Sequence, residues 1–273
     1  MHGVFPFGRP NTEGPTRRPS GDTNVLAVGV HPTAYFVSWW AHDETQPGAT
    51  IGALAVDVEP VPSWDGTTPT PKQVLDQWKD NVNFDDRWGR VATTPVPPLG
   101  RRLLSRHIEP LGATAATTAH LDLVPWFLVE GGNWMQPGEL IRKKFQPWAI
   151  AYGAPQSTLP TRPTGRDLSA FIRIGGRRDQ LREQILDIRP RAILALGQGA
   201  LNGLHELCDD FTPSQARLTR DARYGRLGSC SIDGVNFGLL ATIHPGAQGI
   251  PAAWGPFHRR WMEITRAERP LGN

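Results

Sequence analysis

Two apolar runs that each stop at a His-Pro pair constrain the fold of this chain more than any other feature. The first run, VLAVGV, begins at Val25 and leads into His31-Pro32, and the second, FGLLATI, begins at Phe237 and leads into His244-Pro245. Short runs that are apolar on both faces are typical of strands in a parallel sheet that helices cover on both sides. Proline ends a strand and stiffens its exit. Both histidines are therefore expected at the edge of one sheet.

Strands and helices alternate along the rest of the chain. Further strands are predicted over 117–124 and 191–196, and helices over 70–84, 98–111, 178–188 and 256–266. Asp233-Gly234 predicts a hairpin turn before the last strand. The proline-rich and glycine-rich stretches 43–70 and 131–166 are expected to be irregular.

This alternation indicates βαβ units and a largely parallel sheet. We predict an α/β fold: a single-domain, three-layer α/β/α arrangement with a central, mostly parallel four-stranded sheet. The domain is expected over residues 23–273. Residues 1–22, rich in Pro, Gly and Arg, predict an extended N-terminal arm.

Composition excludes several classes of protein. The longest apolar runs are far shorter than the roughly 18 residues of a membrane span, and the first residues have no apolar core of a signal peptide. The only cysteines are Cys208 and Cys230, too few for a cysteine-type zinc or iron–sulfur site. We therefore expect a cytoplasmic protein with no membrane contact, no metal and no cofactor.

Positive charge gathers in the second part of the chain. Residues 1–150 hold 13 Lys and Arg against 15 Asp and Glu, a net charge of −2, whereas residues 151–273 hold 16 Arg against 11 Asp and Glu, a net charge of +5. Arginine forks suit phosphate groups. The alternative explanation is a GC-rich genome that prefers arginine codons.

Polar residues follow each predicted strand. In open α/β sheets the ligand lies outside the carboxyl ends of the strands. The residues there are His31, Asp122, Gln198 and His244, and we expect them to converge on one cleft.

In order, these strand ends resemble the motifs of the uracil-DNA glycosylase superfamily. GVHPTAYF at 29–36 stands in the place of its first motif, and TIHPGAQG at 242–249 in the place of its last. TTAHLDLVPW at 117–126 is similar to its base-reading strand, and RPRAILALGQGALNGL at 189–204 to its third strand and the helix that follows. The resemblance covers roughly residues 24–262 and marks the chain as a divergent member.

The resemblance implies hydrolysis of the bond between a base and deoxyribose, after the nucleotide has been flipped out of the duplex. His244 matches the residue that stabilises the negative charge of the leaving base. His31 stands where the superfamily has an Asp or Asn that positions the attacking water. His31 either takes over that task or only lines the pocket, in which case Asp43 or Glu44 could act instead.

Asp122 stands where the superfamily has an Asn that reads the base. An ionised carboxylate only accepts hydrogen bonds, which favours the amino group of a cytosine-type base over the O4 of uracil. A carboxyl protonated by burial would read uracil after all. The alternative is that Asp122 only caps a loop. Phe36, with Tyr35 beside it, is the candidate for stacking on the flipped base.

Other residues are candidates for contacts with DNA. Gly197, Gln198 and Gly199 open a helix whose main-chain N–H groups suit a phosphate. Gln248, in the loop after His244, is a candidate wedge beside the flipped nucleotide, as is Ile250. Arg259 and Arg260 are candidates for holding the DNA backbone, although surface arginines are commonly only solvated.

Three functions stay open from the sequence. The first is a monomeric DNA glycosylase with DNA as its partner, acting in base-excision repair of uracil or, as a defence against phage, on modified cytosines in foreign DNA. The second is a catalytically inactive DNA-binding protein of the same fold. The third is a small-molecule nucleoside hydrolase.

Overall fold

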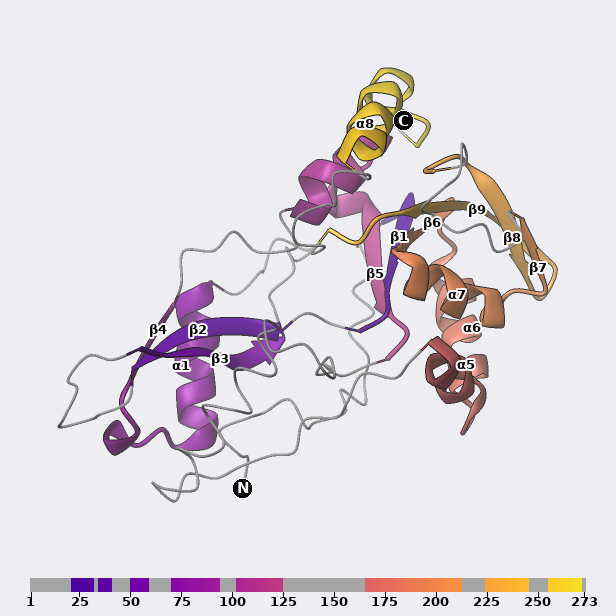
Figure 1. Ribbon diagram of the computed structural model, residues 1–273. Coiled ribbons are helices and arrows are strands. Elements are labelled where there is room, and N and C mark those ends of the chain that lie inside the picture. Colours follow the sequence, from indigo (N-terminus) through magenta and orange to yellow (C-terminus); the bar gives the residue numbers. More distant parts are fainter. Residues whose placement is uncertain are drawn as a thin grey trace.

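The computed structural model describes residues 21–31, 34–40, 50–58, 70–93, 102–124, 165–212, 224–245 and 255–271. Six strands form its larger sheet (Figure 1), in the spatial order β5 (Thr118–Asp122), β1 (Val25–Gly29), β6 (Ala192–Leu196), β9 (Val235–Thr242), β8 (Gly228–Ile232) and β7 (Asp210–Thr212). The predicted α/β class is confirmed.

The larger sheet is mixed. β1 pairs in parallel with β5 and with β6, and β6 pairs in parallel with β9. β8 and β7 extend the sheet in antiparallel fashion. The sheet has six strands where four were predicted, because β8 folds back onto β9 through the predicted turn at Asp233-Gly234 and β7 pairs with β8. Both turn residues have positive φ angles, 49° and 76°, as a tight hairpin turn requires.

Side chains of the central strands alternate between two apolar cores, one on each face of the sheet. Leu26 and Val28 belong to one core, and Val25 and Ala27 to the other. The first core is completed by α5 (Gly165–Arg173), α6 (Arg177–Ile188) and α7 (Gln198–Leu207). The second core is completed by the short helical turns η3 (Leu104–Ile108) and η4 (Glu109–Leu111) and by α8 (Gly255–Glu268). The strands are apolar on both faces because both faces are covered.

A second, antiparallel sheet has the order β3 (Thr50–Val58), β2 (Ala34–Trp40), β4 (Arg90–Thr93), and α1 (Pro71–Val82) packs on β3 and β4. Figure 1 shows this unit to one side of the larger sheet. The prediction was wrong for residues 50–58, which were expected to be irregular, and no strand was predicted over 34–40. α1 lies where it was predicted, and Thr70 begins it with a reciprocal capping box to Gln73.

Several other predictions have outcomes in the structure. The helix expected over 98–111 is a π-helical turn followed by a 3-10 turn in its described part, and α5 was not predicted. Residues 1–20 of the predicted arm lie outside the described ranges. Cys208 and Cys230 are free thiols. None of the helices in the described ranges has both the length and the apolar character of a membrane span.

Candidate functional site

The carboxyl ends of four parallel strands form one row across the larger sheet. Asp122 lies opposite Gly29, Val28 lies opposite Ala195, and Leu196 lies opposite Thr242. Gly29 follows Val28 and Leu196 follows Ala195, so Gly29 and Leu196 belong to the same row. Asp122 therefore lies within the row at the end of β5, and the other three strands leave the sheet from the same edge.

His31, Gln198 and His244 each stand two residues beyond this row, at the ends of β1, β6 and β9. Neighbouring strands are about 4.8 Å apart, so two spacings separate the exits of β1 and β9 by about 10 Å. The structure thus brings the four strand-end residues predicted from the sequence to one edge of the sheet.

The chain reverses its direction across the sheet at β1. The connection from β1 to β5 includes η3 and η4 on one face, and the connection from β5 to β6 includes α5 and α6 on the opposite face. The loops that leave β1 and β6 therefore diverge to opposite faces, and such a point is where open α/β sheets bind ligands. His31 and Gly197 flank it.

The Asp122 side chain is buried, with 2 % of its surface exposed. It lies against the backbone of Gly29, since a Cβ atom at position 29 would stand 2.3 Å from Asp122 Oδ1. His120 Nδ1 lies 3.8 Å from Asp122 Oδ2. Gly29 is thus required by the carboxyl group next to it, a role that the sequence interpretation did not assign.

Arg177, at the start of α6, holds the end of β5 in place. Its Nε donates to the main-chain carbonyl of Leu123 at 3.2 Å, and its Nη2 donates to the carbonyls of Asp122 and Leu123 at 3.2 Å each. Burial lowers the pKa of Arg177, and the charge of Asp122 acts against that decrease. The sequence interpretation missed this arginine because it stands 55 residues after Asp122.

His244 lies against the turn that opens α7. A Cβ atom at position 197 would stand 3.4 Å from His244 Cβ, and the Gly197 N–H donates to the Thr242 carbonyl at 2.7 Å. The Gln198 side chain donates to Asn202 Oδ1 at 2.8 Å, one turn further along α7. Phosphate binding at this helix start would therefore depend on the main-chain N–H groups of residues such as Gly199.

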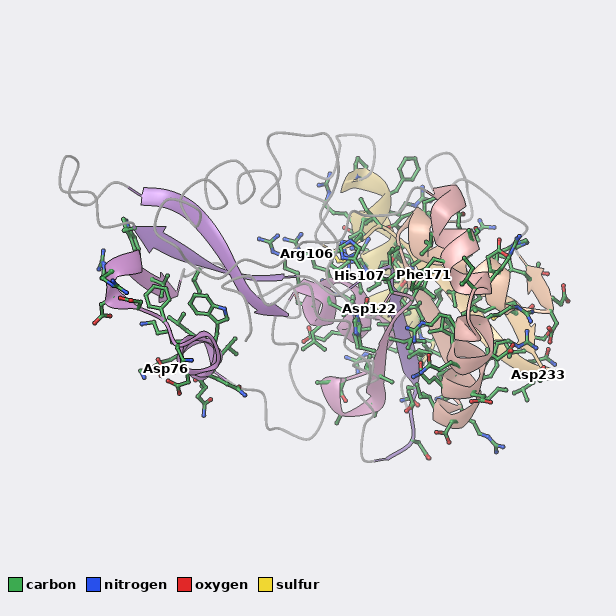
Figure 2. The ribbon with its side chains drawn as sticks, turned by 90° about the horizontal axis from the view of Figure 1, so that it is seen from below. Asp76, Arg106, His107, Asp122, Phe171 and Asp233 are labelled. Carbon is green, nitrogen blue, oxygen red and sulfur yellow. The ribbon has the colours of Figure 1, made fainter. Side chains whose placement is uncertain are left out.

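Two buried histidines that the sequence interpretation left without a role lie beneath the β9 end. The rings of His107 and His258 are 4.7 Å apart, and the side chains are 1 % and 3 % exposed. Burial is the main cause that lowers the pKa of His107 well below its ordinary value, and His258 and His244 add to the decrease. Burial also lowers the pKa of His258, to about 4. Figure 2 shows His107 and Asp122 in the part of the molecule that holds the larger sheet, far from Asp76 of α1.

The other residues predicted for the site lie on β2 or α8, or outside the described residues. Tyr35 and Phe36 are part of β2, at a shift in its register with β3. Arg259 and Arg260 are exposed on α8. Gln248 and Ile250 lie outside the described residues, as do Asp43 and Glu44. Within the described ranges, no group of three or more His, Cys, Asp or Glu side chains is placed to hold a metal ion.

Neither a protein-family model nor a curated protein matches this chain. The functional interpretation therefore rests on the residues at the edge of the larger sheet. Their geometry combines a buried carboxyl group, two strand-end histidines and a helix start.

We expect Gly29→Ala to lower the free energy of unfolding by about 1–3 kcal/mol, because its methyl group would overlap the Asp122 carboxyl group. In an Asp122→Ala background the same change should cost at least about 1 kcal/mol less. Denaturant unfolding of the two single variants and the double variant measures this coupling. Gly21→Ala is the control, since no atom lies within 4 Å of a Cβ there. Additive effects of the two substitutions would contradict the contact.

The buried histidines predict a loss of stability in acid. The folded-state pKa of His258, about 4, lies below the unfolded value of about 6.5. Between these values the unfolded chain binds protons that the folded protein does not, so the free energy of unfolding falls as the pH falls. His258→Gln should be less stable than the wild type at pH 7, with the difference smaller by roughly 2 kcal/mol at pH 5.

Thermal or urea unfolding at both pH values measures this difference. His205→Gln, which changes an exposed histidine on α7, should follow the wild-type pH profile. A constant difference between His258→Gln and the wild type would show that His258 is not buried as a neutral imidazole.

Proposed function

We propose that this protein is a DNA glycosylase that hydrolyses the N-glycosidic bond of a flipped-out pyrimidine and leaves an abasic site. The observation that carries the proposal is the common row of strand ends: His31 and His244 stand two residues beyond it on either side of β6, with Asp122 buried within it. The strand exits that carry the two histidines are two strand spacings apart, about 10 Å, and the proposal places the flipped nucleotide against this edge of the sheet.

In this proposal His244 donates a hydrogen bond to the oxygen of the leaving base, where negative charge develops as the glycosidic bond breaks. His31, on the other side of β6, accepts a proton from water or orients it for attack on C1′ of the sugar. A neutral imidazole is suited to that task, because its unperturbed pKa lies near neutrality. The products are the free base and an abasic deoxyribose.

Asp122 is proposed to read the base. Burial favours its neutral form, which can donate to the O4 of uracil, whereas the nearby positive charge of Arg177 favours the ionised form, which only accepts. An ionised Asp122 would select the amino group of a modified cytosine. Uracil and a modified cytosine are therefore the two substrate classes proposed.

The DNA backbone is proposed to lie along the side of the larger sheet that carries η3 and α8. Residues 102–111 and 255–271 hold six arginines against three glutamates, and Arg259 and Arg260 are exposed there. The guanidinium group of an arginine can donate two parallel hydrogen bonds to the oxygens of one phosphate. The start of α7 would supply main-chain N–H groups to a further phosphate.

A catalytically inactive DNA-binding protein is the second candidate. The observation that favours it is His31 itself, which replaces the Asp or Asn of the first motif. His244 favours the enzyme, because a protein that only binds DNA has no need of a group that stabilises a leaving base.

We expect the wild type to leave abasic sites in at least one oligonucleotide of a panel that carries uracil, hypoxanthine, 5-hydroxymethylcytosine or glucosylated cytosine. Alkali cleavage after incubation detects those sites. His244→Ala should lower the single-turnover rate by about 100-fold or more and leave DNA affinity nearly unchanged, because the hydrogen bond strengthens only in the transition state.

His205→Ala, at an exposed position of α7, is the matched control and should keep the wild-type rate. DNA binding without cleavage on the whole panel would favour the inactive binder. Cleavage of free deoxynucleosides alone would favour the nucleoside hydrolase.

Asp122→Asn should shift the preference of the enzyme toward uracil, because an amide offers a donor as well as an acceptor. The quantity to compare is the ratio of single-turnover rates on uracil and cytosine-type substrates, which is independent of any common loss of activity. Discrimination by hydrogen bonds at a buried site reaches large ratios, since a mismatched base leaves polar groups unpaired. An unchanged ratio would show that Asp122 does not read the base.

A further inference from the structure

A buried polar cluster lies under the β9 end that leads to His244. Its members are Tyr224, Thr242, His107, His258 and Trp261, whose side chains are 8 %, 0 %, 1 %, 3 % and 6 % exposed. Polar groups buried to this extent destabilise a fold unless they are hydrogen-bonded. His107 and Tyr224 contact the two residues before His244. His258 contacts Tyr224 in turn, and Trp261 contacts Gly225.

β8 does not extend along the last residues of β9. The pairing of β8 with β9 stops at Leu239. Beyond it, the Gly225 N–H donates to the Ala241 carbonyl at 3.1 Å, and the Ile243 N–H donates to the Tyr224 hydroxyl at 3.2 Å. Tyr224 and Gly225 thus take the place of β8 along this edge.

The Tyr224 hydroxyl connects the strand end to α8. Because it accepts from the Ile243 N–H, its own proton is available to His258 Nδ1, which lies 2.6 Å away. The donor in this contact depends on the tautomer of His258, and the lowered pKa of His258, about 4, keeps the ring neutral near pH 7. Trp261, one turn further along α8, donates from Nε1 to the Gly225 carbonyl at 3.0 Å.

Thr242 is held in two ways. Its hydroxyl lies 3.1 Å from His107 Nδ1, and its carbonyl accepts from the Gly197 N–H at 2.7 Å. Residues 242 and 243 are therefore fixed by contacts from η3, α7 and the Tyr224 segment. These contacts therefore fix the backbone directly before His244.

We propose that Tyr224 and Thr242 are positioning residues that fix the backbone from which His244 reaches the leaving base, a role that rests on the proposed function. A group that stabilises charge in a transition state has to be held within about 0.5 Å of its productive place. Displacement by about 1 Å from a change outside the reacting atoms lowers a rate by up to about 100-fold. Loss of these contacts therefore affects the chemical step more than binding.

The test uses substitutions that remove one hydroxyl group and keep the side-chain shape. Tyr224→Phe and Thr242→Val should each lower the single-turnover cleavage rate about 10-fold or more, with the Kd for DNA changed less than about twofold. Thr242→Ser, which keeps the hydroxyl, should retain most of the rate.

Thr118→Val is the matched control. Thr118 is 0 % exposed in the same sheet, and its hydroxyl donates to the Thr114 carbonyl at 2.8 Å, at the opposite end of β5 from the site. This variant should lose stability but keep the cleavage rate. Equal rate losses in Thr118→Val and Thr242→Val would show that the cluster affects the rate only through core packing. Normal rates in both Tyr224→Phe and Thr242→Val would overturn the proposal.

A readout without DNA separates this proposal from the glycosylase activity. NMR spectra of the histidine side chains, with the His244 signals assigned from a His244→Asn variant, should show displaced or broadened His244 signals in Tyr224→Phe and Thr242→Val and unchanged signals in Thr118→Val. Displaced signals in a protein that cleaves no substrate would support the positioning and reject the proposed function. Unchanged signals and rates in an active enzyme would reject the positioning alone.

Discussion

The parallel register of β1 with β5 and β6 is the constraint on which the rest of the site depends. It places Gly29 opposite Asp122 and Val28 opposite Ala195, and the β6–β9 pairing continues the row to Thr242. Since alternate residues of a strand face opposite sides, a slip by one residue would move the Asp122 carboxyl group into the core beneath α5 and α6. The alternation of apolar residues between the two cores excludes such a slip, because a slipped strand would turn the side chains of each core toward the opposite face of the sheet.

A carboxyl group at such a position is expensive to bury, and the surrounding contacts offset part of that cost. Gly29 provides the space, His120 lies 3.8 Å away, and Arg177 fixes the two carbonyls at the β5 end while its charge interacts with Asp122. These contacts hold the buried carboxyl group in one position at the end of β5. Buried polar groups held in this way are characteristic of sites that read hydrogen-bond patterns.

The sequence predicted those parts of the structure whose signal is local. β1, β6, α6 and α8 lie within a residue or two of their predicted bounds, because apolar runs and helical spacing specify them directly. The turn at Asp233-Gly234 was predicted by residue type alone. The sheet of β2, β3 and β4 was missed because the residues that pair are up to 56 positions apart and only that pairing stabilises the strands. The contact of His107 with Thr242 spans 135 residues, and no local pattern indicates it. The requirement for Gly29 did have a signal, since a glycine in a strand often marks the close approach of another group.

Five of the eight histidines, namely His31, His107, His120, His244 and His258, belong either to the carboxyl edge of the sheet or to the face that η3 and α8 cover. Charged imidazoles at this density would repel one another, and the lowered pKa values of His107 and His258 show that the buried pair is neutral near pH 7. A neutral imidazole is both a donor and an acceptor, so it can fix a backbone or polarise a leaving group without a counter-ion. In the proposed function, the positive charge for binding DNA comes from the exposed arginines of α8. In the proposed function, this division, with neutral histidines inside and arginines outside, would let one face of the sheet combine a phosphate-binding surface with a site where negative charge develops on a base.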